Sequence, residues 1–144
     1  MSTLRRILLD KGRNVITASP SMSVFDAIRT MAQRNVGALL VVENDELVGL
    51  FSERDYLRKI ALKFRSSRQT ELSEVMSSPV LCANLTDEVD HCMALMTKHR
   101  YRHLPVLEDD ELCGIISMGD LVSFLLHEKE MELDQLSNYI AGGY

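Results

Sequence analysis

The sequence predicts a mixed α/β fold made of two copies of one β-α-β-β-α unit, related by an approximate two-fold axis. Residues 15–61 align with residues 80–126 at a constant shift of 65 positions and without a gap. Within each copy, short β-rich runs enclose a stretch whose apolar residues recur with helical spacing. Each copy is too small to bury much surface alone, so we expect the two to share an interface with a cleft between them.

Each copy is expected to begin with a short strand, at residues 15–18 and 80–83. A polar stretch follows, in which Ser21 and Thr86 are predicted to cap the first helix. An apolar stripe with i, i+3, i+4, i+7 spacing then predicts that helix in both copies. The residues of the two stripes are Val24, Ala27, Ile28 and Met31, and Val89, Cys92, Met93 and Met96.

Two further apolar runs in each copy predict a β-hairpin followed by a second helix. The hairpin strands are expected at residues 36–42 and 47–51, and again at 104–107 and 112–116. Four polar residues separate the strands in both copies, which is typical of a hairpin loop. Helical spacing resumes over residues 55–64 and 120–126.

The segments outside the copies are also expected to be ordered. Leu72, Val75 and Met76 in the connecting segment predict a docked helical turn. Apolar residues near both ends predict helices that cover leftover apolar surface, and the tail helix could equally serve a partner subunit. These residues are Leu4, Ile7, Leu8, Met131, Leu133, Leu136 and Ile140. The expected division is a flanking helix (1–14), a first unit (15–64), a linker (65–78), a second unit (79–127) and a C-terminal helix (128–144).

Composition and charge exclude several classes of function. The formal net charge of −5 disfavours general affinity for nucleic acid or an anionic membrane. No apolar run approaches the roughly 20 residues of a membrane span, and residues 7–9 are too short a stretch for a secretory signal. Cys82, Cys92 and Cys113 are an odd number of cysteines without metal-ligand spacing. We therefore expect reduced thiols in a cytoplasmic protein and no metal site.

One short motif ends the third strand of both copies: Gly, two apolar residues, Ser, two variable residues and Asp. It occupies residues 49–55 and 114–120. A carboxylate at a helix N-terminus is stabilised by the helix dipole and can accept hydrogen bonds from both vicinal hydroxyls of a ribose. The structural alternative is that the serine caps the helix and the aspartate stabilises its first turn. The occurrence of the motif twice in register favours binding.

With this motif and repeat, the chain resembles a tandem pair of cystathionine-β-synthase (CBS) domains, or Bateman module, of the stand-alone bacterial or archaeal type. The resemblance covers both copies and extends to residues 73–77 of the linker and 101–106 of the second unit. It implies two units packed sheet to sheet, with two pseudo-symmetric ligand clefts. The ligands it implies are adenosine derivatives: AMP first, with ADP, ATP, NAD or S-adenosylmethionine as alternatives. No catalytic cofactor is implied.

The resemblance assigns ribose and adenine contacts position by position. Asp55 and Asp120 would bind the ribose hydroxyls, with Ser52 and Ser117 beside them. The expected adenine pocket comprises Ile16, Thr17, Ala18, Val36, Gly37 and Ala38 in the first copy, and Leu81, Cys82, Ala83 and Tyr101 in the second.

The cationic residues that could bind phosphate differ between the copies. Arg54 matches Gly119 of the second copy, whereas Arg102 and His103 take the places of a glycine and an alanine in the first. Arginine can bind phosphate through two parallel hydrogen bonds, so Arg54, Arg102 and His103 are the predicted phosphate ligands. The alternatives are a solvated helix residue for Arg54 and a strand-end histidine for His103. The asymmetry predicts two unequal clefts.

These features predict a regulatory module that binds an adenosine-containing ligand and signals to a separate, unknown effector protein by conformational change. The resemblance also implies a homodimer formed through the helices. Two alternatives are a ligand-independent interaction scaffold with vestigial clefts, and nucleic-acid binding through the basic run between Arg54 and Arg68. The sequence shows no catalytic triad, no paired-carboxylate site and no phosphate-binding glycine-rich loop. We therefore expect that the protein is not an enzyme.

Overall fold

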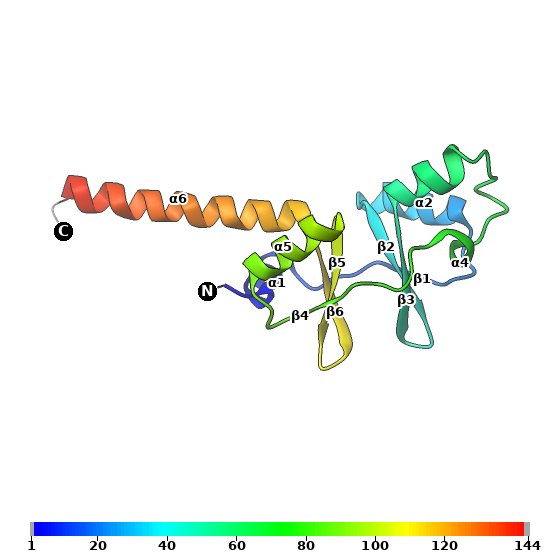
Figure 1. Cartoon of the computed structure of the whole chain (residues 1–144), viewed down its shortest axis with the longest axis horizontal. Helices are drawn as coiled ribbons and strands as arrows, with labels where there is room; N and C mark the ends of the chain where they lie inside the picture. The colour runs from blue at the N-terminus through cyan, green and yellow to red at the C-terminus, as the bar shows by residue number, and fades with distance from the viewer. Residues whose placement is uncertain (1, 143–144) are drawn as a thin grey trace.

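Two three-stranded sheets lie side by side in the computed structural model, which describes residues 2–142, and helices cover both (Figure 1). The first copy contains β1 (Thr17–Ala18), α2 (Val24–Arg34), β2 (Ala38–Glu43), β3 (Glu46–Ser52), α3 (Glu53–Asp55) and the π-helix η1 (Tyr56–Ala61). The second contains β4 (Ala83–Asn84), α5 (Val89–His99), β5 (His103–Glu108), β6 (Glu111–Ser117) and α6 (Met118–Gly142). Outside the copies lie α1 (Leu4–Lys11) and α4 (Leu72–Val75). The predicted α/β fold of two equivalent units is confirmed.

The two sheets have the same topology and register. In each, the first strand pairs in parallel with the second, and the second pairs antiparallel with the third. Leu39 lies opposite Phe51 in the first sheet, and Leu104 lies opposite Ile116 in the second. A register shift follows Val41 and recurs at the equivalent Val106. The repeat in sequence is therefore a repeat in hydrogen bonding.

The hairpin turns are tighter than the four polar residues of the sequence suggest. Glu43 pairs with Glu46, which leaves a two-residue turn whose Asn44 and Asp45 have φ angles of 52° and 64°. The second hairpin turns in the same way through Asp109. Asn and Asp tolerate the left-handed conformation that such turns require, and this turn type matches the twist of paired strands.

The predicted helix caps are wrong in both copies. Ser23, not Ser21, precedes α2, and its hydroxyl oxygen accepts a hydrogen bond from the Asp26 backbone N–H at 3.1 Å. In the second copy α5 follows Glu88, whose side chain makes no capping hydrogen bond, so Thr86 is not the cap. Both helices begin later than the predicted caps imply. Each starts at the first residue of its apolar stripe, Val24 or Val89, which is also the first residue of that stripe to be buried in a core.

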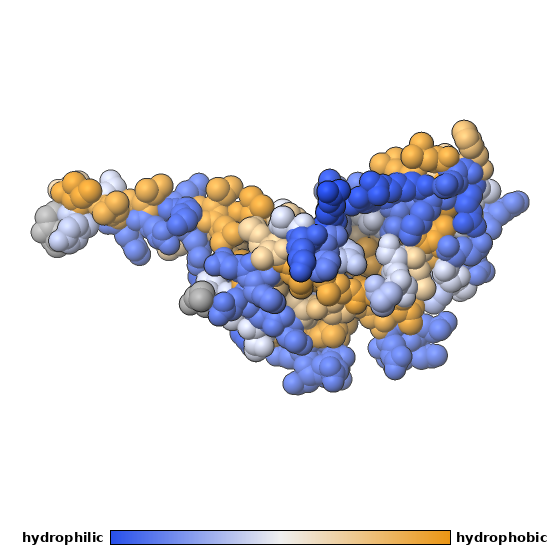
Figure 2. All heavy atoms as spheres, in the orientation of Figure 1, coloured by the Kyte–Doolittle hydropathy of each residue, from blue (hydrophilic) through white to orange (hydrophobic). Residues whose placement is uncertain are grey.

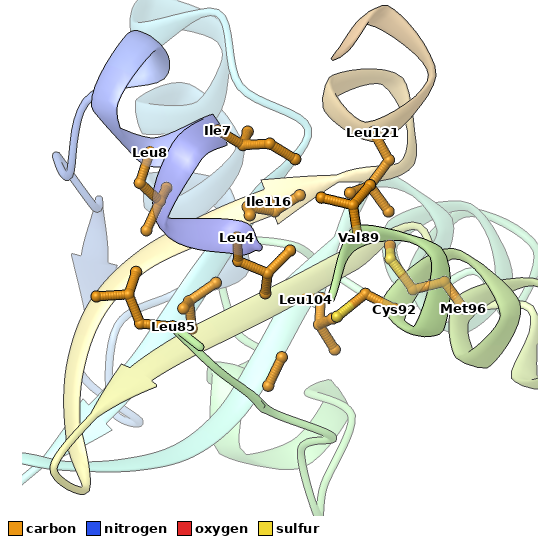
Figure 3. Packing of buried hydrophobic residues seen from close by; sticks show 12 residues of the cluster. Leu4, Ile7, Leu8, Leu85, Val89, Cys92, Met96, Leu104, Ile116 and Leu121 are labelled. Carbon is orange, nitrogen blue, oxygen red and sulfur yellow. The ribbon is translucent and has the colours of Figure 1, made fainter. Parts of the chain in front are cut away.

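Each core is completed by a segment from outside its copy. Leu72 and Val75 of α4 are buried against the first core, although α4 directly precedes the second copy. Leu4 and Leu8 of α1 are buried in the second core, although α1 precedes the first copy (Figure 3). Burial of one such side chain stabilises the fold by about 1.5–3 kcal/mol. Each copy is therefore completed by the segment that precedes the other copy in the chain, and this exchange ties the two copies together.

These crossing segments explain the two glycines of the repeated motif. A Cβ on Gly49 would overlap the Sδ of Met76, next to α4, and would lie 2.8 Å from its Cγ. A Cβ on Gly114 would lie 2.8 Å from Cδ1 of Leu8 in α1. Both separations are shorter than ordinary Cβ contacts, so any other residue at these positions would force the side chain of Met76 or Leu8 to shift.

The two sheets pack against each other through the faces that their helices leave free. Successive side chains of a strand point to opposite faces. Leu39 and Val41 belong to the first core, whereas the alternate residue Leu40 is buried outside that core. Its counterpart Pro105 is likewise buried outside the second core. A direct contact joins the copies where the side chain of His103 lies against Gly37.

The C-terminal helix departs from expectation. α6 starts on the second core through Leu121 and then projects away from both sheets (Figure 1). Its apolar tail residues remain exposed instead of covering leftover surface of the same chain; they are Met131, Leu133, Leu136 and Ile140. None of the described helices is both long enough and apolar enough to cross a membrane.

Candidate functional site

The repeated Ser and Asp form a capping box at the junction of strand and helix. Asp55 Oδ2 accepts hydrogen bonds from the Ser52 backbone N–H at 3.0 Å and from its hydroxyl at 3.2 Å. In the second copy Asp120 Oδ2 accepts a hydrogen bond from the Ser117 backbone N–H at 2.8 Å. The serine Oγ accepts in return from the aspartate N–H, at 3.3 Å and 3.0 Å respectively. The structural interpretation of the motif is therefore realised in both copies.

Both carboxylate oxygens of Asp55 are engaged. Oδ1 accepts a hydrogen bond from the Ser77 hydroxyl at 3.0 Å and lies 3.1 Å from Lys59 Nζ. Lys59 Nζ also donates to the backbone carbonyl of Val75 at 2.9 Å, which ties η1 to α4. With a side chain only 9% exposed, Asp55 is closed off by the linker segment.

Asp120 is more open than Asp55. Its side chain is 28% exposed, and Lys11 at the end of α1 donates to Oδ2 while also donating to the Ile115 carbonyl at 2.7 Å. Within the described residues, Oδ1 of Asp120 receives no hydrogen bond. Burial raises the pKa of Asp120, but the hydrogen bonds from Lys11 and Ser117 outweigh it and hold the pKa below its usual value. One carboxylate oxygen is therefore available to a ligand here.

His103 lies at the junction of the two copies, half-buried at the start of β5. A Cβ on Gly37 would be 3.5 Å from His103 Nε2 and 3.4 Å from Glu53 Oε1. Burial lowers the pKa of His103, and the positive charge of Lys11 lowers it further, while Glu53 and Asp120 raise it in part. Charges from three separate segments thus meet beside the second capping box.

The two predicted arginines are exposed. Arg54 reaches across to the second copy, where its guanidinium donates to the Arg100 carbonyl at 3.4 Å. Arg102 makes no ion pair within the described part of the chain. Arg102 is also among the cations that lower the pKa of His103, which places its charge near the same cluster.

The predicted adenine residues of the two clefts differ in their exposure. Ala18, Ala38 and Ala83 are buried, Thr17 and Tyr101 are exposed, and Ile16, Val36, Gly37, Leu81 and Cys82 are half-buried. A pocket of about 390 Å³ lies between α2 and η1 and includes only Val36 and Gly37 of this set. Glu53 also lines it. None of the residues that line this pocket belongs to the second copy.

Several residues of the site were missed by sequence reasoning. Lys59 lies four residues after Asp55, a spacing at which a helical ion pair could have been expected. Ser77 and Lys11 come from segments outside the copies, and Lys11 is 109 positions from Asp120. No local pattern signals such contacts. Among the described residues, no cluster of three or more His, Cys, Asp or Glu could hold a metal ion.

Comparisons with known protein families, sequences and structures all indicate the same family. The CBS domain matches this chain twice, over residues 10–62 and 72–127. The CBS domain-containing protein CBSX3, mitochondrial, of Arabidopsis thaliana is 39% identical over 152 residues, which cover 99% of this chain and 74% of that protein. A protein with CBS domains from Burkholderia ambifaria has a similar structure, with a TM-score of 0.84 and 45% identity over 88% of this chain and 95% of that one.

One similar structure contains ligands. The CBS domain pair of protein MJ0100, in complex with 5′-methylthioadenosine and S-adenosyl-L-methionine, has a TM-score of 0.77 and 25% identity. The likeness covers 90% of this chain and 98% of that one.

Proposed function

Because this chain belongs to the CBS domain family, as two CBS domains in tandem, we propose that it is a regulatory module for an adenosine-containing ligand. The observation that carries the proposal is the second capping box. There a carboxylate with one free oxygen, on Asp120, accepts a hydrogen bond from the cation Lys11, and the charge of Arg102 lies near the same cluster. A ribose hydroxyl needs an acceptor and a phosphate needs cations, and this junction offers both.

The proposed ligand contacts are those that the resemblance implies, and the geometry of the second capping box supports them. Asp120 and Ser117 bind the ribose hydroxyls in the second cleft, and Arg102 and His103 bind phosphate. AMP is the first candidate, and ADP, ATP, NAD and S-adenosylmethionine share its ribose and adenine. The complex of the MJ0100 pair with two adenosine compounds supports this ligand class.

The two clefts are proposed to be unequal. In the first cleft a ribose would have to displace Ser77 and Lys59 from Asp55, a carboxylate with both oxygens engaged. Separating a partly buried carboxylate from its hydrogen-bond donors costs free energy that the ligand must supply. We therefore expect the second cleft to fill first and the first to bind weakly, with Arg54 as its phosphate ligand.

Regulation is proposed to work through differential affinity and not through catalysis. A ligand can shift an equilibrium only by binding one arrangement more tightly than another. Ligand at Asp120 would change the contact of Lys11 and thereby the docking of α1 on the second copy. A homodimer formed through the helices would present this change to an effector protein in the cytoplasm.

Calorimetric titration tests the proposal. We expect AMP or another adenosine ligand to bind, and Asp120→Ala to weaken binding by about tenfold or more, the loss of a charge-assisted hydrogen bond. Asp55→Ala should affect only the weaker binding of a second ligand molecule in the first cleft. Asp90→Ala, which removes an exposed carboxylate of α5, is the control. Unchanged affinity in Asp120→Ala would refute the ribose assignment.

A ligand-independent scaffold is the second candidate. It is favoured by one observation: both repeated aspartates already serve their own capping boxes. This alternative predicts no binding of any adenosine compound at millimolar concentration. Nucleic-acid binding has less support, because Lys59 and Arg65 of the basic run pair with carboxylates and Arg68 lies over the ring of Phe25.

A further inference from the structure

His103 faces the side of the second sheet on which the proposed ligand site lies. In the register of β5 and β6, His103 lies opposite Ser117, and opposite residues of paired strands place their side chains on the same face. The next pair, Leu104 and Ile116, is buried in the second core, so His103 and Ser117 face away from that core. The ring therefore stands beside the second capping box, and it also lies against Gly37 of the first copy.

The two ring nitrogens of His103 are available to a ligand. Neither makes a hydrogen bond within the described part of the chain. Neither is fully buried, because every fully buried side-chain nitrogen or oxygen of the described residues has a partner. A neutral imidazole has one donor and one acceptor nitrogen, whereas the protonated ring has two donors.

Four charged groups surround His103, and they come from each segment packed against it. Lys11 at the end of α1 and Arg102 directly before β5 lower its pKa, while Glu53 of α3 and Asp120 of α6 raise it. Burial of the ring is the largest cause and lowers the pKa, so the net result lies below the usual value of 6.5. In the free protein the ring is therefore mostly uncharged at pH 7 and above.

The surface next to His103 is cationic and open to solvent. Arg54 of the first copy donates a hydrogen bond to the Arg100 carbonyl of the second, so its guanidinium spans the junction of the copies. Arg100 and Arg102 are exposed on the same junction. Figure 2 shows strongly hydrophilic side chains over the region where the two copies meet. Clustered cations of this kind attract an anion to the site.

We propose that a phosphate-bearing ligand takes up a proton from water at His103 as it binds in the second cleft, so that occupancy rises as the pH falls. A phosphate monoester carries a charge of about −1.5 to −2 at pH 7. Such a charge beside the ring favours the imidazolium form, which then donates a charge-assisted hydrogen bond to a phosphate oxygen. The inference rests on the proposed function, because it requires a ligand in the second cleft.

This proton makes His103 a determinant of ligand specificity. An adenosine compound without a phosphate supplies no negative charge to hold the proton, and the sulfonium cation of S-adenosylmethionine would repel it. The preference of the second cleft for a nucleotide should therefore grow as the pH falls. The first copy has no such residue, since Ala38 is the counterpart of His103 and lies opposite Ser52. Only the second cleft is thus coupled to pH in this way.

Calorimetric titration with AMP measures the proton directly. At pH 7, in two buffers of different ionisation enthalpy, the observed binding enthalpies should differ by an amount that corresponds to uptake of about 0.3–1 proton per AMP. The dissociation constant of AMP should be about threefold lower at pH 6.5 than at pH 7.5. The phosphate of AMP titrates itself near pH 6, and the His103→Gln variant measures that share.

Matched controls assign the proton to His103 and to the phosphate. His103→Gln retains a hydrogen-bonding side chain that cannot be charged, and its AMP affinity should change little between pH 7.5 and 6.5. His91→Gln removes an exposed histidine at the far end of α5 and should behave as the wild type. The compound 5′-methylthioadenosine has adenine and ribose but no phosphate, and should bind without proton uptake.

The outcomes separate this inference from the proposed function. Binding of both compounds without proton uptake would overturn the role of His103 and leave the adenosine site standing. Proton uptake that persists in His103→Gln would overturn it as well. Binding of neither compound at millimolar concentration would refute the proposed function and this inference with it.

Discussion

Lys11, the last residue of α1, donates a hydrogen bond to the carboxylate of Asp120, 109 positions further along the chain. The equivalent carboxylate of the first copy, on Asp55, is held instead by the Ser77 hydroxyl from the linker. In both copies, therefore, a segment from outside the repeat closes over the carboxylate of the motif. A ligand bound to either aspartate, as proposed, would therefore act on the position of a flanking segment.

Replacement of Lys11 by Met should raise the pKa of Asp120, because Lys11 provides the largest of the interactions that lower it. Carboxyl chemical shifts followed against pH would measure the change. Loss of this half-exposed ion pair should destabilise the fold by only about 0.5–1 kcal/mol. Lys129→Met removes an exposed lysine of α6 and is the matched control. An Asp120 pKa that does not move would show that the backbone N–H of Ser117 dominates.

Stability should fall as the pH is lowered from 8. His103 and Asp120 both have folded-state pKa values below their usual values of 6.5 and 3.8, so the fold binds protons less readily than the unfolded chain. The contribution of His103 is fully present above pH 6.5 and is lost as the pH falls through its folded pKa; that of Asp120 follows below pH 3.8. Urea unfolding across pH 8 to 5 should show the first loss. In the variant His103→Gln the free energy of unfolding should depend less on pH between 8 and 5. The same pH dependence as in the wild type would contradict the role assigned to His103.

Gly49→Ala and Gly114→Ala should each destabilise the protein by about 1–3 kcal/mol, because the added methyl group would overlap Met76 or Leu8. Chemical denaturation measures both changes. The double variant Gly49→Ala with Met76→Ala should recover part of the loss, since the shortened side chain makes room. If the losses of stability caused by Gly49→Ala and by Met76→Ala simply added in the double variant, the added methyl group would not act through its contact with Met76.

Leu4→Ala should cost about 2–5 kcal/mol of the free energy of unfolding, as in the truncation of a fully buried leucine. Leu9→Ala on the same helix is the control, because Leu9 is 73% exposed and should change stability little. Hydrogen exchange should locate the effect of Leu4→Ala in α5, β5 and β6, since α1 packs on the second copy. Loss of protection in β2 and β3 instead would contradict the crossed packing.

The repeat, the two hairpins and the helical stripes could be predicted because each depends on residues close together in the chain. Spacing alone reports which residues share a face, and a gap-free shift maps one copy onto the other. The caps at Ser21 and Thr86 were wrong because several polar residues precede each helix. Which of them becomes the cap depends on where the core begins to bury the stripe.

Sequence alone thus establishes the class of fold, the repeated Ser and Asp of the motif and the difference in charge between the copies, whereas the structure shows that this Ser and Asp form capping boxes. The sequence does not reveal that α1 completes the second core, that α4 completes the first, or that Lys11 reaches Asp120. Those contacts join residues far apart in the chain, and their free energy comes from surfaces that exist only once both sheets have formed. The same reason governs the C-terminal helix: its stripe is visible in the sequence, but only the folded chain leaves it uncovered.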